Sequence, residues 1–88
     1  MPTSAPNALD VRPLPSRRKS ATVLAAFDRL EGGESFVLVD DHDPDGVRSY
    51  VEARRPGLVQ WDALRDGPRV WHIEITRRSR PGVNGTES

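Results

Sequence analysis

Apolar and polar positions recur with two different periods along the chain, and the changes of period define the predicted elements. Residues 9–11 form a short apolar run that ends at Pro13 and Pro15, which predicts a brief strand and a rigid turn. From Ser16 onward the apolar spacing is helical, and Gly32-Gly33 ends that pattern. The apolar side of this first helix consists of Val23, Phe27 and Leu30, widened by Leu24.

Residues 35–39 are a continuous apolar run rich in β-branched side chains, which is typical of a central strand covered at least partly on both faces. Asp43-Pro44 then has the residue types of a helix N-cap followed by a first helical position. We therefore expect a second helix that ends at Pro56-Gly57. One side of it carries Val47, Tyr50, Val51 and Arg54.

Two further strands are predicted near the end of the chain. The third lies around Val59 and Trp61, and Asp66-Gly67 is a strong hairpin signal. In the fourth strand apolar and polar residues alternate strictly, so one face is predicted to be core and the other wet. The apolar positions are Trp71, Ile73 and Ile75. We expect both tryptophans to belong to the hydrophobic core.

The predicted element order is β-α-β-α-β-β, which places the chain in the α+β class. Because parallel β-α-β crossovers are right-handed, both helices should cover the same face of the sheet. The expected architecture is a two-layer α/β sandwich, with a four-stranded mixed sheet and two helices on one face. Residues 9–77 form this single domain, while the polar segments 1–8 and 78–88 are predicted to be disordered tails.

Composition narrows the function classes. The 88 residues carry a formal net charge of zero and no cysteine. Disulfides, zinc–thiolate sites and thiol nucleophiles are therefore excluded, and no overall field attracts nucleic acid or an anionic membrane. No apolar leader or membrane-spanning run is present, so a cytoplasmic location is the expectation. We expect no cofactor, and a monomer or a weak dimer.

The neutral total hides a segregation of charge. A basic run covers Arg12 to Lys19, and an acidic run covers Asp40 to Asp45. The loops that follow parallel strands meet at the carboxyl edge of a sheet, so the two runs should lie side by side there. Lys19 is the only lysine beside twelve arginines, which on the sequence alone we attribute to base composition.

Two kinds of site are conceivable at this edge. Free amides at the start of the first helix could bind an anion together with Arg12, Ser16, Arg17 and Arg18. The simpler interpretation is that Ser16 is a helix cap and that the arginines are solvated. Alternatively, His42 could bind a divalent metal together with a carboxylate of Asp40, Asp41 or Asp43, and the preferred metal ligands would be His42 and Asp43.

The simpler interpretation of the acidic loop is again a cap, provided by Asp43. The other histidine, His72, is expected to lie out of reach of His42. A Ser16–His42–Asp nucleophilic triad has no support, because Ser16 lacks the glycine-flanked elbow of such nucleophiles. The predicted ligand-binding residues are Arg12, Ser16, Arg17, Asp41, His42 and Asp43.

Three segments together resemble domain-of-unknown-function family 2249, a bacterial family. They are LDVRPLP at 9–15, FDRLEGGESFVLVDDHDP at 27–44, and W-x-x-x-x-x-GP-x-VW at 61–71. The resemblance spans about 9–77. That family is similar to the TusA/SirA sulfur carriers, in which a Cys-Pro pair opens the first helix. Ser16 and Arg17 stand at those positions here, and a serine hydroxyl cannot carry sulfane sulfur.

The resemblance also implies an auxiliary part in metal or redox physiology, since relatives occur beside hemerythrin-like domains and near nitrogen-oxide respiration genes. Our sequence-based hypothesis is a non-enzymatic accessory module. It would hold a small anionic ligand or a protein partner at the loop edge, and it is not a sulfur carrier. The alternatives are a metal-binding or redox-accessory domain using His42, and a regulatory nucleic-acid binder, against which the neutral charge argues.

Overall fold

A computed structural model describes residues 7–79 of the chain, and the predicted tails lie almost wholly outside this range. Helix α1 (Ser16–Asp28) follows the first strand, β1 (Ala8–Asp10). Strand β2 (Ser35–Asp40) leads into helix α2 (Asp45–Arg54). Strands β3 (Val59–Asp66) and β4 (Trp71–Arg77) form the closing hairpin. The predicted order of six elements is confirmed.

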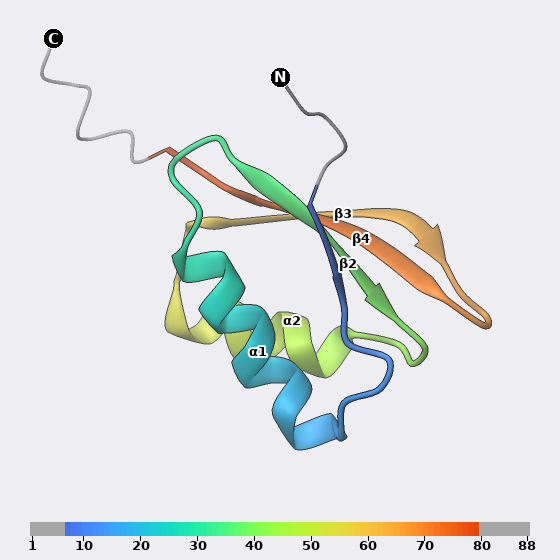
Figure 1. The fold of residues 1–88 in the computed structure, drawn as a ribbon. Coiled ribbons are helices and arrows are strands. Elements are labelled where there is room, and N and C mark those ends of the chain that lie inside the picture. The colour runs from blue at the N-terminus through green and yellow to red at the C-terminus, as the bar shows by residue number, and fades with distance from the viewer. Residues whose placement is uncertain (1–6, 80–88) are drawn as a thin grey trace, which may run out of the picture.

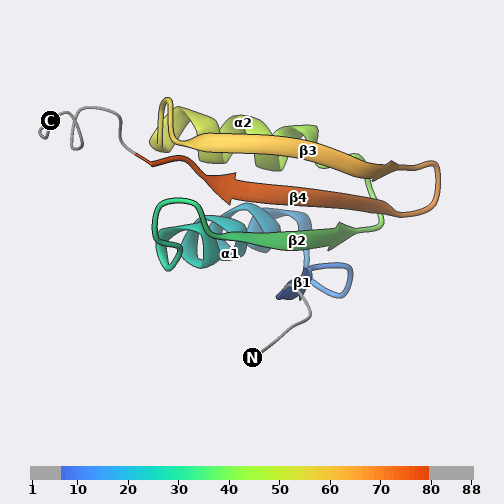
Figure 2. The same cartoon turned by 90° about the horizontal axis from the view of Figure 1, so that it is seen from above.

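The four strands form one mixed sheet in the order β1-β2-β4-β3. Strand β1 is parallel to β2, whereas β4 is antiparallel to both β2 and β3. Strand β3 therefore runs in the same direction as β2. Both helices lie on one side of the sheet, which gives the expected two layers (Figures 1 and 2).

The core lies between the helices and the inner face of the sheet, and it follows the predicted periodicities. In β2 the inward positions are Phe36, Leu38 and Asp40, and the positions between them are half-buried. On α1 the buried positions recur every four residues, at Lys19, Val23 and Phe27. The buried apolar residues are Val11, Val23, Phe27, Phe36, Leu38, Val47, Val51, Val59, Ile73 and Ile75.

Several predicted boundaries are wrong by one to a few residues. Helix α1 ends at Asp28, before the glycine pair that was expected to stop it. The N-cap of α1 is Pro15 and no side chain caps that end, so the interpretation of Ser16 as a cap is wrong. Helix α2 begins at Asp45, with Pro44 as its N-cap. Helix ends fray, so differences of this kind are common at helix boundaries.

Candidate functional site

The carboxyl ends of β1, β2 and β3 point to one end of the molecule, because these three strands run in the same direction. The β1–α1 loop, the β2–α2 loop and the β3–β4 turn all follow from these ends. We call this end the carboxyl edge (Figure 1). The predicted juxtaposition of the basic and acidic runs is confirmed, since Lys19 of α1 contacts Asp40 and Asp41 directly.

A buried ion pair lies at the centre of the carboxyl edge. The Lys19 Nζ atom donates to Asp40 Oδ1 at 2.8 Å and to Asp41 Oδ1 at 3.1 Å. The side chains of Lys19 and Asp40 are only 6% and 2% exposed, whereas that of Asp41 is 40% exposed. The backbone amide of His42 is a second donor to Asp40 Oδ1, at 3.3 Å. Charges that are this deeply buried require such partners.

These contacts shift the pKa values of both Lys19 and Asp41. Burial by itself lowers the pKa of Lys19, but the hydrogen bonds to Asp40 and Asp41 outweigh it, and the pKa is raised. The pKa of Asp41 is lowered, chiefly by the hydrogen bond from Lys19 and next by the one with His42. The lysine is therefore held as an ammonium, which makes it a fixed charge rather than a nucleophile.

Asp41 also orients the imidazole of His42. The Nδ1 atom of His42 lies 2.8 Å from Asp41 Oδ1. Because an ionised carboxylate only accepts hydrogen bonds, we assign the Nδ1 hydrogen to this contact. The Nε2 atom of the neutral ring then carries the lone pair. The His42 side chain is 77% exposed, so this lone pair is available to a partner or to water.

A metal at this position would compete with the lysine. Asp40, Asp41 and His42 have the spacing of a cation site, with one potential ligand atom from each within 4.8 Å of the others. The Lys19 ammonium already lies 2.8, 3.1 and 3.5 Å from atoms of these three residues. Asp43, the alternative ligand, accepts the Asp45 amide at 3.1 Å instead. The donor set is thus built around an ammonium, and His72 is not part of it within residues 7–79.

The predicted site residues separate into two groups. Ser16, His42 and Asp43 line a hollow of about 220 Å³ over the ion pair. Arg12 instead folds back on Asp10, with contacts of 2.6 to 3.1 Å. This pairing lowers the pKa of Asp10 to about 2, mainly through the side-chain hydrogen bond from Arg12. Arg17 lies on the exposed first turn of α1 and does not line this hollow.

The first turn of α2 separates this hollow from a second one. The second hollow has a volume of about 320 Å³ and contains both tryptophans of the chain. We call it the tryptophan hollow. Trp61 and Trp71 are half-buried at the margin of the core, where we had expected them inside it. Asp43 lines both hollows, so the two form neighbouring parts of one surface.

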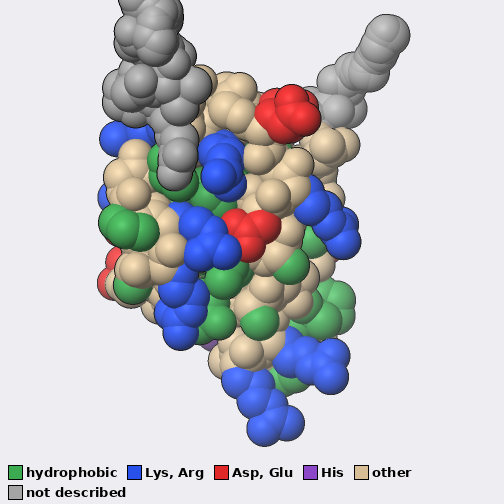
Figure 3. Space-filling view, turned by 90° about the vertical axis from the view of Figure 1, so that its left-hand side faces the viewer, with side chains coloured by type: hydrophobic (Ala, Val, Ile, Leu, Met, Phe, Trp, Pro, Cys, Tyr) green, Lys and Arg blue, Asp and Glu red, His purple; other side chains and the backbone are tan. Residues whose placement is uncertain are grey.

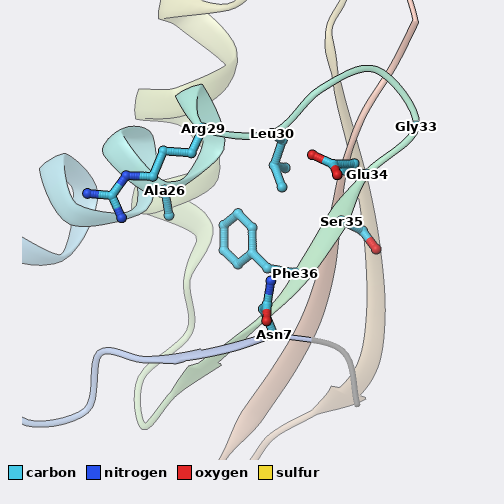
Figure 4. Close-up of a pocket in the computed structure, with 8 residues that line it drawn as sticks. All are labelled: Asn7, Ala26, Arg29, Leu30, Gly33, Glu34, Ser35 and Phe36. Carbon is cyan, nitrogen blue, oxygen red and sulfur yellow. The ribbon is translucent and has the colours of Figure 1, made fainter. Parts of the chain in front are cut away.

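A third hollow, of about 450 Å³, lies at the other end of α1. Figure 4 shows Phe36, Leu30 and Ala26 converging on it, while Arg29 extends away from it. The Ser35 hydroxyl donates a hydrogen bond to the Glu74 carboxylate at 3.3 Å. The Glu34 carboxylate accepts one from the Glu31 backbone amide at 2.8 Å. The lining thus combines these apolar side chains with polar residues, among them Asn7 and Arg29. At this end of the molecule basic side chains predominate over acidic ones (Figure 3).

The sequence did not point to Lys19 or to the tryptophan hollow as parts of the site, and it suggested Asp40 only as a possible metal ligand beside His42. Two signals were available for the ion pair. Asp40 continues the inward alternation of Phe36 and Leu38 in β2, and Lys19 lies one helical step before Val23. No equivalent signal pointed to the tryptophan hollow, because it depends on β3 lying beyond β4 in the sheet.

Comparison with known proteins identifies the family of the chain. The model of the family described as an uncharacterized conserved protein (DUF2249) matches residues 8–77. The chain belongs to this family, as the resemblance indicated. No curated protein matches the chain. No solved structure matches it either. Neither helix within residues 7–79 has the length and apolar character required to cross a membrane.

Proposed function

We propose that the protein is a non-enzymatic binding module that recognises a basic segment of a protein partner at the carboxyl edge. The observation that carries this proposal is the Lys19–Asp40 ion pair, which fixes Asp41 and His42 at the surface. A buried ion pair is costly to desolvate, and one use of such a pair is to hold neighbouring groups in a defined arrangement.

The charges at this edge favour a basic partner over the small anion that the sequence left as an alternative. Carboxylates from Asp40, Asp43, Asp45 and Asp66 line the two hollows. The basic groups in the same hollows are already paired, Lys19 with Asp40 and Asp41, and Arg48 with Glu52. Other arginines of this end line neither hollow: Arg17, Arg18, Arg65 and Arg69. Complementary charge steers a partner and sets its register.

The test is a pair of titrations of ¹⁵N-labelled protein, one with inorganic phosphate and one with the peptide acetyl-Gly-Arg-Gly-Arg-Gly-amide. The peptide is expected to shift the amides of residues 40–48 and to lose affinity as salt is raised. Phosphate at the same ionic strength is expected to leave them unchanged. Phosphate-induced shifts at Ser16 to Lys19, with none from the peptide, would overturn the proposal in favour of an anion site.

Two isosteric variants make the test specific. Asp41→Asn removes the carboxylate that Lys19 and His42 contact at this edge. Asp62→Asn removes an exposed carboxylate on β3 that forms no ion pair within residues 7–79. Peptide affinity is expected to fall in the first variant and to stay unchanged in the second. Equal losses in both variants would reduce the interaction to non-specific charge attraction.

A further inference from the structure

The tryptophan hollow has a specific construction at the turn between β3 and β4. Asp40, Trp71 and Asp66 are neighbours across three strands, since Trp71 pairs with Asp40 on β2 and with Asp66 on β3. Gly67 has a φ of 73° and leaves room for the indole, because a Cβ there would lie 2.7 Å from Trp71 Cζ2. The turn thus holds one aromatic ring between two carboxylate-bearing positions.

The hollow already contains one guanidinium. The Arg48 Cζ atom lies 5.6 Å from the centroid of the Trp61 ring, which is within the range of a cation–π contact. Arg48 is also tied to Glu52 at 3.0 Å, one turn further along α2. Trp61 is therefore in contact with the Arg48 guanidinium, whose charge is balanced by Glu52 outside the hollow.

Three carboxylates line the same hollow without a matching cation. Asp43, Asp45 and Asp66 form no ion pair within the part of the chain that the structure describes. The N-terminus of α2 contributes only about half a positive charge, which is less than the carboxylates supply. The hollow therefore combines aromatic surface with excess negative charge, the combination that recognises organic cations.

We propose that the tryptophan hollow receives an arginine side chain of the partner. This inference rests on the proposed function and names the group that the partner inserts. A guanidinium is planar, so it can stack on an indole while its N–H groups donate to two carboxylates. The volume of about 320 Å³ is at the small end of ligand pockets, which suits one side chain rather than a folded segment.

Intrinsic fluorescence provides a direct measurement, because Trp61 and Trp71 are the only tryptophans and both line the hollow. The probes are the acetyl-Gly-Arg-Gly-Arg-Gly-amide peptide, its citrulline counterpart, and N-acetylarginine amide. We expect a saturable emission change with the arginine peptide and none with the citrulline peptide, which keeps the shape but lacks the charge. If N-acetylarginine amide binds more tightly than the peptide, the hollow recognises a small molecule, and the proposal that a protein partner supplies the guanidinium is wrong.

Two substitutions have opposite expected effects. Asp66→Asn is expected to weaken arginine-peptide binding about twofold to fivefold, the range of one exposed cation contact. Asp62→Asn is the matched control and should have no effect. Arg48→Gln removes the resident guanidinium and is expected to tighten binding. Weaker binding in Arg48→Gln would overturn the proposal, because it would mean that Arg48 supports the site rather than competing for it.

The failure of this inference can be separated from that of the proposed function. If the peptide shifts the amides of residues 40–48 but leaves the fluorescence unchanged, the arginine pocket is wrong and the binding module stands. If neither signal changes, both are wrong. If the fluorescence changes with protein concentration when no peptide is present, a second copy of the chain binds the hollow. That result would overturn the arginine pocket.

Discussion

Two ion pairs at the carboxyl edge have the same chemistry and opposite surroundings. Asp10 and Arg12 lie two residues apart and make several contacts, the shortest at 2.6 Å, with side chains 43% and 51% exposed. Lys19 and Asp40 lie 21 residues apart, with one contact of 2.8 Å, and are almost fully buried. The exposed pair has the better geometry, whereas the buried pair connects α1 to β2.

Burial, rather than the number of hydrogen bonds, decides what each ion pair contributes to the fold. An exposed pair exchanges its partner for water at little cost. A buried charge that loses its partner stays in a medium that cannot solvate it. The Asp10–Arg12 pair therefore shapes a local turn, while the Lys19–Asp40 pair holds the two layers in register at the site.

The largest expected effect comes from removing the buried ammonium. Lys19→Met keeps a chain of similar length but leaves the Asp40 carboxylate buried without its cation. We expect the free energy of unfolding to fall by about 3–5 kcal/mol, a large part of the stability of a domain of this size. Urea unfolding followed by circular dichroism measures it. A loss below about 1 kcal/mol would show that water reaches Asp40 and that the pair is not a buried one.

Replacing both partners separates the cost of an unpaired charge from the value of the pair. The double variant Lys19→Met/Asp40→Val keeps a β-branched residue in β2 and leaves no buried charge. We expect it to be more stable than Lys19→Met alone, by about 1–4 kcal/mol. A double-mutant cycle of urea unfolding measures the coupling. If the double variant is less stable than either single variant, Asp40 stabilises the fold through the His42 amide rather than through Lys19.

The fold of this protein was predictable because periodicity and turn residues agree along the chain. The alternation in β4 and the helical spacing in α1 each predicted which face of the element is apolar. The residues that are buried in the structure lie on those two faces. The buried pair was also within reach of the sequence. Lys19 and Asp40 occupy inward positions of their own elements, and two opposite charges at inward positions are expected to pair.

The rest of the site depends on tertiary arrangement that no local pattern contains. The insertion of β4 between β2 and β3 brings Trp71 between Asp40 and Asp66. Arg12 pairs with Asp10, so its guanidinium is not free for the ligand that the sequence suggested. The sequence does not indicate which of these partners Arg12 takes. Helix starts are uncertain for the same reason, as Ser16 illustrates.

An intermediate effect is expected from Asp41, which borders the buried pair but is partly exposed. Its lowered pKa means that the folded state favours the ionised carboxylate, so its contribution is present above the unfolded pKa of about 3.9. That contribution is lost as pH falls through the folded pKa. Urea midpoints of wild type and Asp41→Asn should therefore differ at pH 7 and converge once the pH falls below the folded pKa of Asp41. A difference that is constant with pH would assign the effect to packing.

The smallest effect is expected from the exposed pair, although the pKa of its carboxylate, Asp10, is lowered to about 2. Arg12→Met removes the cation that causes this shift. A lowered folded-state pKa stabilises the fold above the unfolded value, so the urea midpoint at pH 7 should fall as the Asp10 pKa measured by carboxyl NMR rises. The fall should be small, because an exposed pair between residues this close in sequence is screened by water and can also form in the unfolded chain. A loss of stability comparable to that of Lys19→Met would contradict the comparison, because it would mean that the β1–α1 turn rather than the buried pair holds α1 on the sheet.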